Sequence, residues 1–563
     1  MRVGRKALLG PMLMLVLLLG GAAALASTYV VYIPLDSPVY DELETLNGLG
    51  VLDTYLSEIK PISRVEAARL TLEAGKNLGT SEGRDALAQS IVKALRSDLS
   101  QEVGWLENNA EDDQPTMIQP LQRAEAQYIF SRGDQRFWNT GGLGGTTPTG
   151  GLHAVEGTPL LPDNDGIPTA TGSNEVLRWN LWGGVGGFLT AYGEPAVTGP
   201  FTHDLRNAER FRLLDGEAVV SLGNFALSFG QEEMQWGTGQ FAALSQGNNA
   251  APFPALRLQN VHPTQLPWIL GYLGQFRYQI FFGQLDSDRY FAHPWIDGQI
   301  FSFKPLPDFE FGFTHTIDFG GRHNDFYSPL GFLGRASGAD TGSVAVGNTN
   351  SRGGIFLKFY FPRLRNAQLY QEILGEDNLT AEAAPIGRFL PFLAVSYQGG
   401  VYLPRLTADG LTDLRFEYAI QEPNYSTHSD SLYWAYNGWQ MGDAMGPNST
   451  QIDLQIGRWF PGLTKASADL YYTERAPNFG TNQSYPTAIY GPVLTKEHSG
   501  GIAFDVLRIP QITRWTGDAL VDGRARVALE YVDRINFGGP GNFRALVMLS
   551  TSLNPAWSNL VWR

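Results

Sequence analysis

Apolar and polar residues alternate along most of the chain after its first fifth, in runs of about ten residues that end in Gly, Pro, Asn or Asp clusters. Period two is the pattern of β-strands, because successive side chains point to opposite faces. Nearly every run has an aromatic-rich face and a charged face, as in a barrel with apolar side chains toward lipid and polar ones toward the lumen. We therefore expect Phe416 to face lipid and its neighbour Arg415 to face the lumen.

The length of the alternating region sets the expected number of strands. Residues 117–563 hold roughly 16–18 strands, at ~10 residues per spanning strand and ~15 per average connection. We predict an all-β transmembrane barrel of 16–18 antiparallel strands with a small N-terminal α-helical domain. Clear strands are expected to begin near Leu121, Val176, Phe225, Phe276, Phe309, Ile355, Leu393, Leu414, Ile452, Ala468, Ile502, Val527 and Ala545.

Long stretches rich in Gly, Asn, Thr and Pro separate some of these strands. They are too polar to pack as a core, so we expect them to form the extracellular loops. Residues 366–388 are a candidate for a further long loop with a short helix. The polar stretches are residues 139–174, 336–353, 424–450 and 474–498.

The first residues have the composition of a secretory signal. Basic Arg2, Arg5 and Lys6 precede an apolar run that ends in small residues before Ser27, so we predict a signal peptide at residues 1–26. The alternative is a membrane-anchoring helix, because the run approaches the length that spans a bilayer. No later segment has such a run, and an exported chain of this kind can span a membrane only as a closed barrel.

Residues 27–116 have helical periodicity, which predicts a small periplasmic domain docked against the barrel mouth. Ser37 and Pro38 are typical of a helix start, and Ser63 with Glu66 forms a capping box for a second helix. The apolar stripe of a third helix comprises Leu87, Ile91, Leu95 and Leu99.

The segment from Asp36 to Ala67 resembles one half-repeat of an S-layer-homology domain. The resemblance rests on Asp36-Ser37-Pro38, Leu46, Gly50, Pro61 and Arg64 through Ala67. It implies a second role for the helical domain, namely a tether to peptidoglycan. An acidic linker, residues 111–115, joins this domain to the strands.

Composition and motif searches narrow the possible chemistry. The chain has no cysteine, so it contains no disulfide or thiolate metal site, and its net charge of −15 argues against nucleic acid as a partner. Zinc-protease, nucleophile-elbow and phosphate-loop motifs are absent from the sequence, and no two histidines share the i, i+4 spacing of a helical metal site. We expect a protein that is not an enzyme and holds no metal or cofactor.

Two chemical alternatives stay open. Residues 163–166 resemble the start of a calcium loop, although Gly166 comes two residues early for an EF-hand, and a solvated loop is the other interpretation. A pair of inward carboxylates could hydrolyse glycosidic bonds, whereas the simpler expectation is cross-strand pairs of opposite charge lining a wet lumen. The inward charged residues are Arg178, Arg277, Glu310, Lys358, Glu417, Asp453, Asp469, Asp505, Arg526 and Glu530.

Three motifs together carry a family resemblance. Residues 227–258 contain Trp236-Gly237-Thr238-Gly239 followed by a Leu-Ser-Gln-Gly-Asn-Asn-Ala-Ala-Pro turn. Residues 438–449 contain Gly-Trp-Gln-Met-Gly-Asp, and residues 33–40 open with Ile-Pro-Leu-Asp. In these motifs the chain resembles the Wzi family of outer-membrane capsule-assembly proteins. It departs from the usual barrel terminus in ending on Arg563 rather than on an aromatic residue.

The resemblance implies a barrel of about eighteen strands in the bacterial outer membrane and a lectin-like role for capsular or extracellular polysaccharide. Aromatic rings stack on sugar C–H faces, and amides and carboxylates bind hydroxyls. The candidate polysaccharide-binding residues are Trp236, Asn248, Asn249, Trp434, Tyr436, Asn437, Trp439 and Asp443. The first three could instead form a buried turn in the lumen, and the loop aromatics an interfacial girdle.

A second function competes with the lectin. An outer-membrane porin or diffusion channel would share the alternating strands and the signal peptide, and its helical domain would be a periplasmic plug or a peptidoglycan tether. The expected partners are polysaccharide and outer-membrane lipid, with peptidoglycan as a further candidate partner of the N-terminal domain and no nucleic acid. Retention of polysaccharide on cells and conductance in bilayers separate the two functions.

Overall fold

A computed structural model describes most of the chain. The described residues are 28–80, 86–110, 114–139, 153–155, 160–161, 163–199, 211–241, 243–287, 291–322, 349–376, 396–421, 427–428, 432–446, 449–475, 496–509, 520–554 and 560–562. The expected signal peptide lies outside them, so its cleavage stays a prediction.

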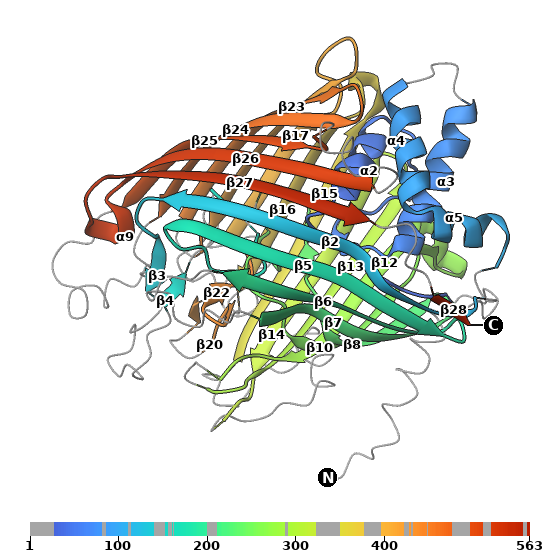
Figure 1. Ribbon diagram of the computed structural model, residues 1–563, viewed down its shortest axis with the longest axis horizontal. Coiled ribbons are helices and arrows are strands. Elements are labelled where there is room, and N and C mark those ends of the chain that lie inside the picture. Colours follow the sequence, from blue (N-terminus) through green and yellow to red (C-terminus); the bar gives the residue numbers. More distant parts are fainter. Residues whose placement is uncertain are drawn as a thin grey trace.

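Eighteen antiparallel strands close into a barrel, which confirms the expected fold class and strand number (Figure 1). Strands pair in chain order, and β2 closes the ring because Ala124 lies opposite both Trp179 and Leu553. The strands are β2 (Thr116–Arg132), β5 (Gly172–Val185), β6 (Leu189–Gly199), β7 (Phe211–Leu222), β8 (Phe225–Gln231), β10 (Pro254–Asn260), β12 (Gln275–Gln284), β13 (Trp295–Leu306), β14 (Phe309–Phe319), β15 (Thr349–Phe361), β16 (Ala367–Glu376), β17 (Ser396–Leu403), β18 (Thr412–Gln421), β23 (Ser449–Phe460), β24 (Thr464–Arg475), β25 (Glu497–Leu507), β26 (Leu520–Asp533) and β27 (Asn542–Asn554).

Shorter strands complete the described sheet structure. Two of them, β11 (Thr264–Gln265) and β28 (Leu560–Trp562), extend the barrel wall at its rim. Four two-stranded ribbons pair β1 (Ile59–Lys60) with β9 (Gln235–Trp236), β3 (Phe137–Asn139) with β4 (His153–Val155), β19 (Thr427–His428) with β20 (Leu432–Tyr433), and β21 (Ala435–Tyr436) with β22 (Trp439–Gln440).

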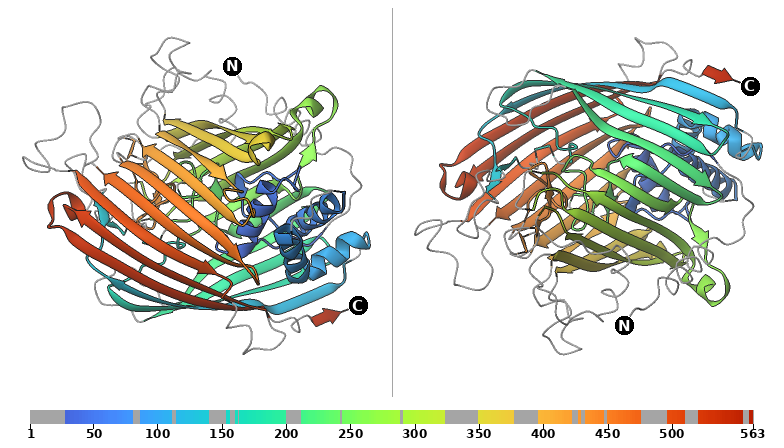
Figure 2. Two further views of the ribbon diagram at one scale, coloured as in Figure 1. Left: turned by 90° about the horizontal axis from the view of Figure 1, so that it is seen from above. Right: turned by 90° about the horizontal axis from the view of Figure 1, so that it is seen from below.

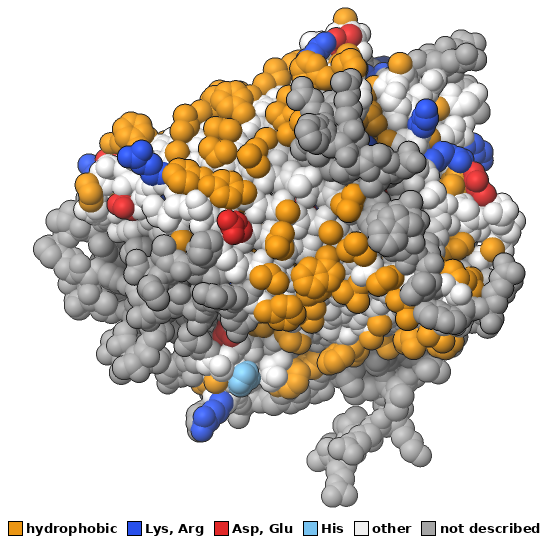
Figure 3. All heavy atoms as spheres, viewed as in Figure 1, with side chains coloured by type: hydrophobic (Ala, Val, Ile, Leu, Met, Phe, Trp, Pro, Cys, Tyr) orange, Lys and Arg blue, Asp and Glu red, His pale blue; other side chains and the backbone are white. Residues whose placement is uncertain are grey.

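The expected facing of the strands is confirmed on β18. Phe416 is 39% exposed on the outer face, whereas Arg415 is 6% exposed toward the lumen. On the side of the barrel shown in Figure 3, hydrophobic side chains gather over the outer faces of the strands. This outer band is the surface that lipid would cover.

Placing a charge on the outer face of β18 should therefore destabilise the barrel. We expect Phe416→Arg to cost about 2–4 kcal/mol if the site lies near the bilayer midplane. Gln455→Arg is the matched control, because Gln455 lies opposite Arg415 on the lumen face and lines a polar cavity there. Urea unfolding of both variants from lipid vesicles measures the difference, and equal losses would contradict the assigned facing.

Five strands were missed from the sequence, namely β6, β7, β10, β13 and β16, because glycine, proline or mixed faces obscure their alternation. On β6, for example, the pairing register with β7 shifts between Glu194 and Pro195. The expected loop at residues 366–388 is wrong over its first part, because β16 occupies Ala367–Glu376; the rest lies outside the described residues.

Four helices precede the barrel wall: α2 (Pro38–Gly48), α3 (Arg64–Thr80), α4 (Ala86–Asp98) and α5 (Ser100–Glu107). The predicted caps are confirmed, because the Ser37 hydroxyl accepts from Val39 N–H and the Ser63 hydroxyl from Glu66 N–H. Glu66 does not complete its capping box and instead binds Arg69. The described helices include none that is long and apolar enough to cross a membrane.

The helices pack across one end of the barrel (Figure 2). Their core includes Leu43, Leu70 and Ile91 and reaches Trp459 of β23. Most connections at this end are short, as between Phe460 and Thr464, whereas connections at the opposite end are longer, as between Phe319 and Thr349. The helices thus cover the short-turn mouth of the barrel.

Candidate functional site: a lumen filled by two layers

Residues that precede the barrel in sequence enter its lumen and pair with its inward charges. The Asp36 carboxylate lies 3.1 Å from Arg123 and also contacts Arg178, and these guanidinium groups hold the Asp36 pKa below its usual range against the opposing effect of burial. Glu42 lies 2.8 Å from Arg508, yet burial raises the Glu42 pKa to about 8. The N-terminal segment thus places carboxyl groups beside arginines of the wall and its rim, although Glu42 itself is largely protonated at neutral pH.

Further wall cations bind the same segment. The Arg277 guanidinium donates to the carbonyl oxygens of Leu56 and Pro61, both at 3.3 Å. Lys358 donates to the Ser57 hydroxyl at 3.0 Å and faces Glu310 in the strand register. The expectation of cross-strand charge pairs is confirmed at Glu310, whose carboxylate lies 2.8 Å from Lys304 on the neighbouring strand β13, but the expected wet lumen is here occupied by protein.

A second layer lies closer to the long-loop end and is built from residues 232–255 and 434–441. Its apolar core packs against inward side chains of β12, β13 and β15. We call this core the lumen plug; its members are Ile59, Met234, Trp236, Ala250, Phe253, Ala255, Phe281, Leu285, Ile296, Ile300, Phe356, Trp434, Trp439 and Met441.

This layer corrects the expectation that the polar stretches cannot pack as core. Within residues 424–450, Trp434, Trp439 and Met441 are buried, and within residues 139–174 both Leu160 and Leu161 are buried against the wall. A few apolar residues in a polar stretch are enough to form a core here, because inward side chains of the wall supply the apolar partners that the local sequence lacks.

Trp236 and Trp434 are both fully buried in the lumen plug. The Trp236 indole N–H donates to the Gln279 side-chain oxygen at 2.6 Å, and its ring lies 5.2 Å from that of Phe281. The Trp434 indole N–H donates to the Ser245 carbonyl oxygen at 3.1 Å. Both rings are therefore out of reach of a sugar in this conformation.

An arginine that the sequence did not single out supports the plug. The Arg352 guanidinium, on β15, stacks 3.6 Å from the centre of the Trp434 ring, which is a close cation–π contact. Arg352 is 1% exposed. Nothing in the local sequence marks this residue, because its partner lies in a distant loop.

The predicted amide residues join the plug to other loops. The Asn249 side-chain N–H donates to the Gln440 carbonyl oxygen at 3.1 Å, and the Asn248 amide lies 3.4 Å from the Asp165 carboxylate. The same two residues also form a backbone hydrogen bond, in which Asp165 N–H donates to the Asn248 carbonyl oxygen at 2.9 Å. Both asparagines are buried and fix the relative positions of three loops.

The calcium interpretation of residues 163–166 finds no support in these contacts. The segment is a turn hydrogen-bonded to the plug, with Asp165 7% exposed and 3.7 Å from Arg178, rather than a solvated loop. Throughout the described part of the chain, no three carboxylate or histidine side chains are grouped so that they could hold a metal ion.

Tyr436, Asn437 and Trp439 belong to one hairpin, whose turn is formed by Asn437 and Gly438, both with positive φ. An Asn-Gly pair is the preferred sequence for this turn, so the hairpin could have been predicted from the sequence. Trp439 faces the plug, whereas Asn437 is exposed and Tyr436 is partly exposed against Phe253. Of the candidate residues, only Tyr436 and Asn437 present side chains to a large ligand.

The Asp443 carboxylate, 3% exposed, ends the same loop. It accepts from the Met445 N–H at 2.8 Å and from the Gln421 side chain. Burial raises the Asp443 pKa to about 7, although the Met445 N–H opposes the shift. The protonated form is thus favoured in the folded plug.

The lumen plug should consequently be most stable at low pH. A carboxyl whose folded pKa is raised binds its proton in the folded state, so its stabilising contribution is full below the unfolded pKa and is lost as pH rises through about 7. We expect the protection factors of residues 434–446, which correct exchange rates for the intrinsic effect of pH, to be higher at about pH 5 than at about pH 8. Asp443→Asn should reduce this pH dependence; an undiminished dependence would assign it to other carboxyls.

A polar cavity of about 240 Å³ remains between the two layers. Asp41 and Glu44 line it from α2, Asn248 from the second layer, and Arg415 and Lys465 from the wall. This volume holds several waters but no chain of sugars. This cavity is therefore a small polar space between the two packed layers.

Comparison with known proteins identifies the family of this closed barrel. The family model of the capsule assembly protein Wzi matches residues 145–511. The chain belongs to the Wzi family. The family resemblance is thereby confirmed, and two of its three motifs, residues 227–258 and 438–449, lie within the matched segment.

Two relatives of known origin can be compared with this Wzi-family chain. The structure of Escherichia coli Wzi, described as an outer-membrane protein involved in group 1 capsule assembly and a carbohydrate-binding β-barrel, matches with a TM-score of 0.59 and 19% identity over 92% of this chain and 98% of that one. This likeness establishes the shared fold. An uncharacterized 55.8 kDa protein from the cps region of Klebsiella pneumoniae is 28% identical over 178 residues, which are 31% of this chain and 35% of that protein.

Proposed function

We propose that this protein is an outer-membrane lectin that holds capsular or extracellular polysaccharide at the cell surface and catalyses no reaction. Membership of the Wzi family carries the proposal. The E. coli member of the same fold is described as carbohydrate-binding, and the closed barrel with an apolar outer band suits a surface protein anchored in lipid.

The filled lumen favours a lectin over the alternative of a diffusion channel. A porin needs a continuous aqueous path, but the N-terminal segment and the lumen plug lie one behind the other in the described lumen. Ion pairs such as Asp36–Arg123 hold the first layer against the wall, and two fully buried tryptophans pack in the second. Polysaccharide is then held outside the barrel rather than transported through it.

The inward carboxylates give little support to glycoside hydrolysis. Glu417 accepts from the Gln240 N–H at 2.9 Å and the Phe241 N–H at 3.0 Å, so it is occupied in holding the second layer. Asp505 contacts Arg526, and Glu530 lies 2.9 Å from Arg544. A hydrolase needs two free carboxylates across an open sugar site.

Within the lectin, the exposed hairpin is the most accessible candidate for sugar contact. Tyr436 offers a ring for stacking and Asn437 an amide for hydroxyls, while the six other candidate residues are buried. Tyr436→Ala should weaken binding of purified polysaccharide, and Tyr436→Phe should retain most of it because the ring remains. Equal binding by the wild type and both variants would exclude this hairpin as the sugar-binding site.

The helical domain, residues 27–116, is assigned to the periplasm, where it closes the barrel. Short connections at its end of the barrel are typical of the periplasmic side. The S-layer-like residues are engaged within the protein, since Asp36 binds Arg123 and Arg64 lies 2.6 Å from Glu102. These contacts favour a plug over a peptidoglycan tether.

Deleting the gene and measuring the distribution of polysaccharide tests the lectin. We expect less polysaccharide on the cells and more in the medium, with total synthesis unchanged because the protein catalyses no step. Complementation with the Tyr436→Ala variant should restore retention only partly. Undiminished cell-bound polysaccharide in the deletion strain would refute the attachment role.

A further inference from the structure

One apolar segment lies outside both the barrel wall and the lumen. Between β11 and β12 the chain forms a short 3₁₀ helix, η1 (Trp268–Leu273), and turns its large side chains away from the protein. Trp268 is 87% exposed, Ile269 77% and Tyr272 84%. Such a cluster of exposed aromatic and aliphatic residues on a surface marks contact with another apolar phase.

The position of η1 relative to the wall is well defined. Thr264 of β11 pairs with Phe276 at the start of β12, so the loop begins at the rim. Gly274 has a φ of 73° and lies so close to the Lys304 carbonyl oxygen that a Cβ would clash with it. The loop therefore packs closely against the end of β13, at the same end of the barrel as the helices.

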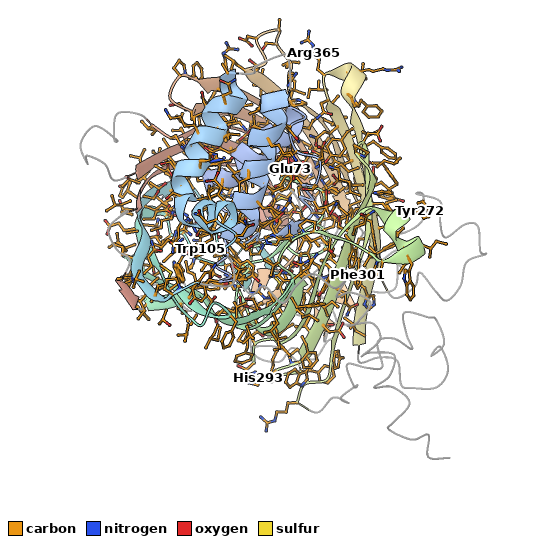
Figure 4. All side chains as sticks on the ribbon, turned by 90° about the vertical axis from the view of Figure 1, so that its right-hand side faces the viewer. Glu73, Trp105, Tyr272, His293, Phe301 and Arg365 are labelled. Carbon is orange, nitrogen blue, oxygen red and sulfur yellow. The ribbon has the colours of Figure 1, made fainter. Side chains whose placement is uncertain are left out.

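The η1 segment points sideways, away from the barrel axis. The view from the helical end shows η1 and Tyr272 outside the ring of strands, beside the helices rather than over the barrel mouth (Figure 4). A loop with this direction extends parallel to the membrane plane. It continues the outer apolar band, in which Leu306 of β13 is 55% exposed and Leu256 of β10 is 46% exposed.

The loop that contains η1 has no charged residue, in contrast to another connection at the same end of the barrel. Residues 263–276 contain no acidic, basic or histidine residue. The connection between β15 and β16 also forms a 3₁₀ turn, η4 (Pro362–Leu364), but there Arg363 and Arg365 flank an exposed Leu364. An uncharged loop with Trp and Tyr beside aliphatic residues has the composition of a membrane interface.

We propose that η1 is a lateral membrane anchor that inserts Trp268, Ile269 and Tyr272 at the boundary between headgroups and acyl chains of the periplasmic leaflet. The partner is phospholipid rather than protein, because the loop continues the lipid-facing band and has no charge to orient a protein partner. Since η1 occurs on the β10–β13 flank, it fixes the depth of that side of the barrel in the membrane.

The absence of cysteine makes this proposal directly testable. Ile269→Cys in the full chain, labelled with an environment-sensitive fluorophore and reconstituted in phosphatidylethanolamine–phosphatidylglycerol vesicles, should show a blue-shifted emission. Lipids spin-labelled near the headgroup should quench it more than lipids labelled deep in the chain. Iodide should quench it severalfold less than it quenches the control, Leu364→Cys on η4.

Two outcomes would overturn the proposal. Equal iodide quenching at both positions would place η1 in water. Protection from iodide without quenching by spin-labelled lipid would assign η1 to a protein contact, such as a second copy of the chain. Heat-modifiable migration of both labelled proteins confirms that each barrel is folded, so a negative result cannot be attributed to misfolding.

Discussion

A chain that lacks residues 28–110 should conduct ions in planar lipid bilayers, whereas the full chain should give small or no steps. The deleted segment fills the short-turn mouth and pairs with wall charges such as Arg123 and Arg508. Its removal also takes Ile59 out of the lumen plug, together with the pairing of β1 to β9 that positions Trp236. The freed inward charges would then draw water and ions into the lumen.

Two controls make the conductance result decisive. Heat-modifiable migration shows whether the shortened barrel is closed, and sedimentation with peptidoglycan tests the competing role of the helices. An unchanged conductance would mean that the second layer alone seals the lumen. Loss of peptidoglycan binding with unchanged conductance would support the tether in place of the plug.

Trp236→Ala should lower the free energy of unfolding by about 3–5 kcal/mol, the range for removing a fully buried large aromatic side chain. Trp236 is 0% exposed and packs 5.2 Å from Phe281, so its loss leaves a cavity in the lumen plug. It also leaves the Gln279 side-chain oxygen without the indole N–H that it accepts. Urea unfolding from lipid vesicles measures this change.

Trp236→Phe is the matched control. It keeps most of the ring volume and loses the hydrogen bond to Gln279, which is worth about 1 kcal/mol. A Trp236→Ala variant that unfolds like the wild type but no longer binds polysaccharide would contradict the structural role. It would instead show that the plug opens to expose this ring to sugar.

The limits of prediction are clearest at the candidate site. Motif residues such as Trp236 and Asn249 were correctly recognised as distinctive, but an aromatic or amide residue has the same local signature in a sugar site and in a folded-in loop. Their burial depends on apolar residues of β12, β13 and β15 that are distant in sequence. Asn437-Gly438 was the local signal that could have revealed the hairpin.

Local sequence patterns were sufficient to predict the barrel, the facing of residues such as Phe416 and Arg415, the starts of helices at Ser37 and Ser63, and the family. Each of these follows from local periodicity, capping or motifs. The filling of the lumen, the stacking of Arg352 on Trp434 and the sideways direction of η1 became apparent only in the folded chain. These features depend on which distant segments the closed wall brings together, and no local pattern encodes that.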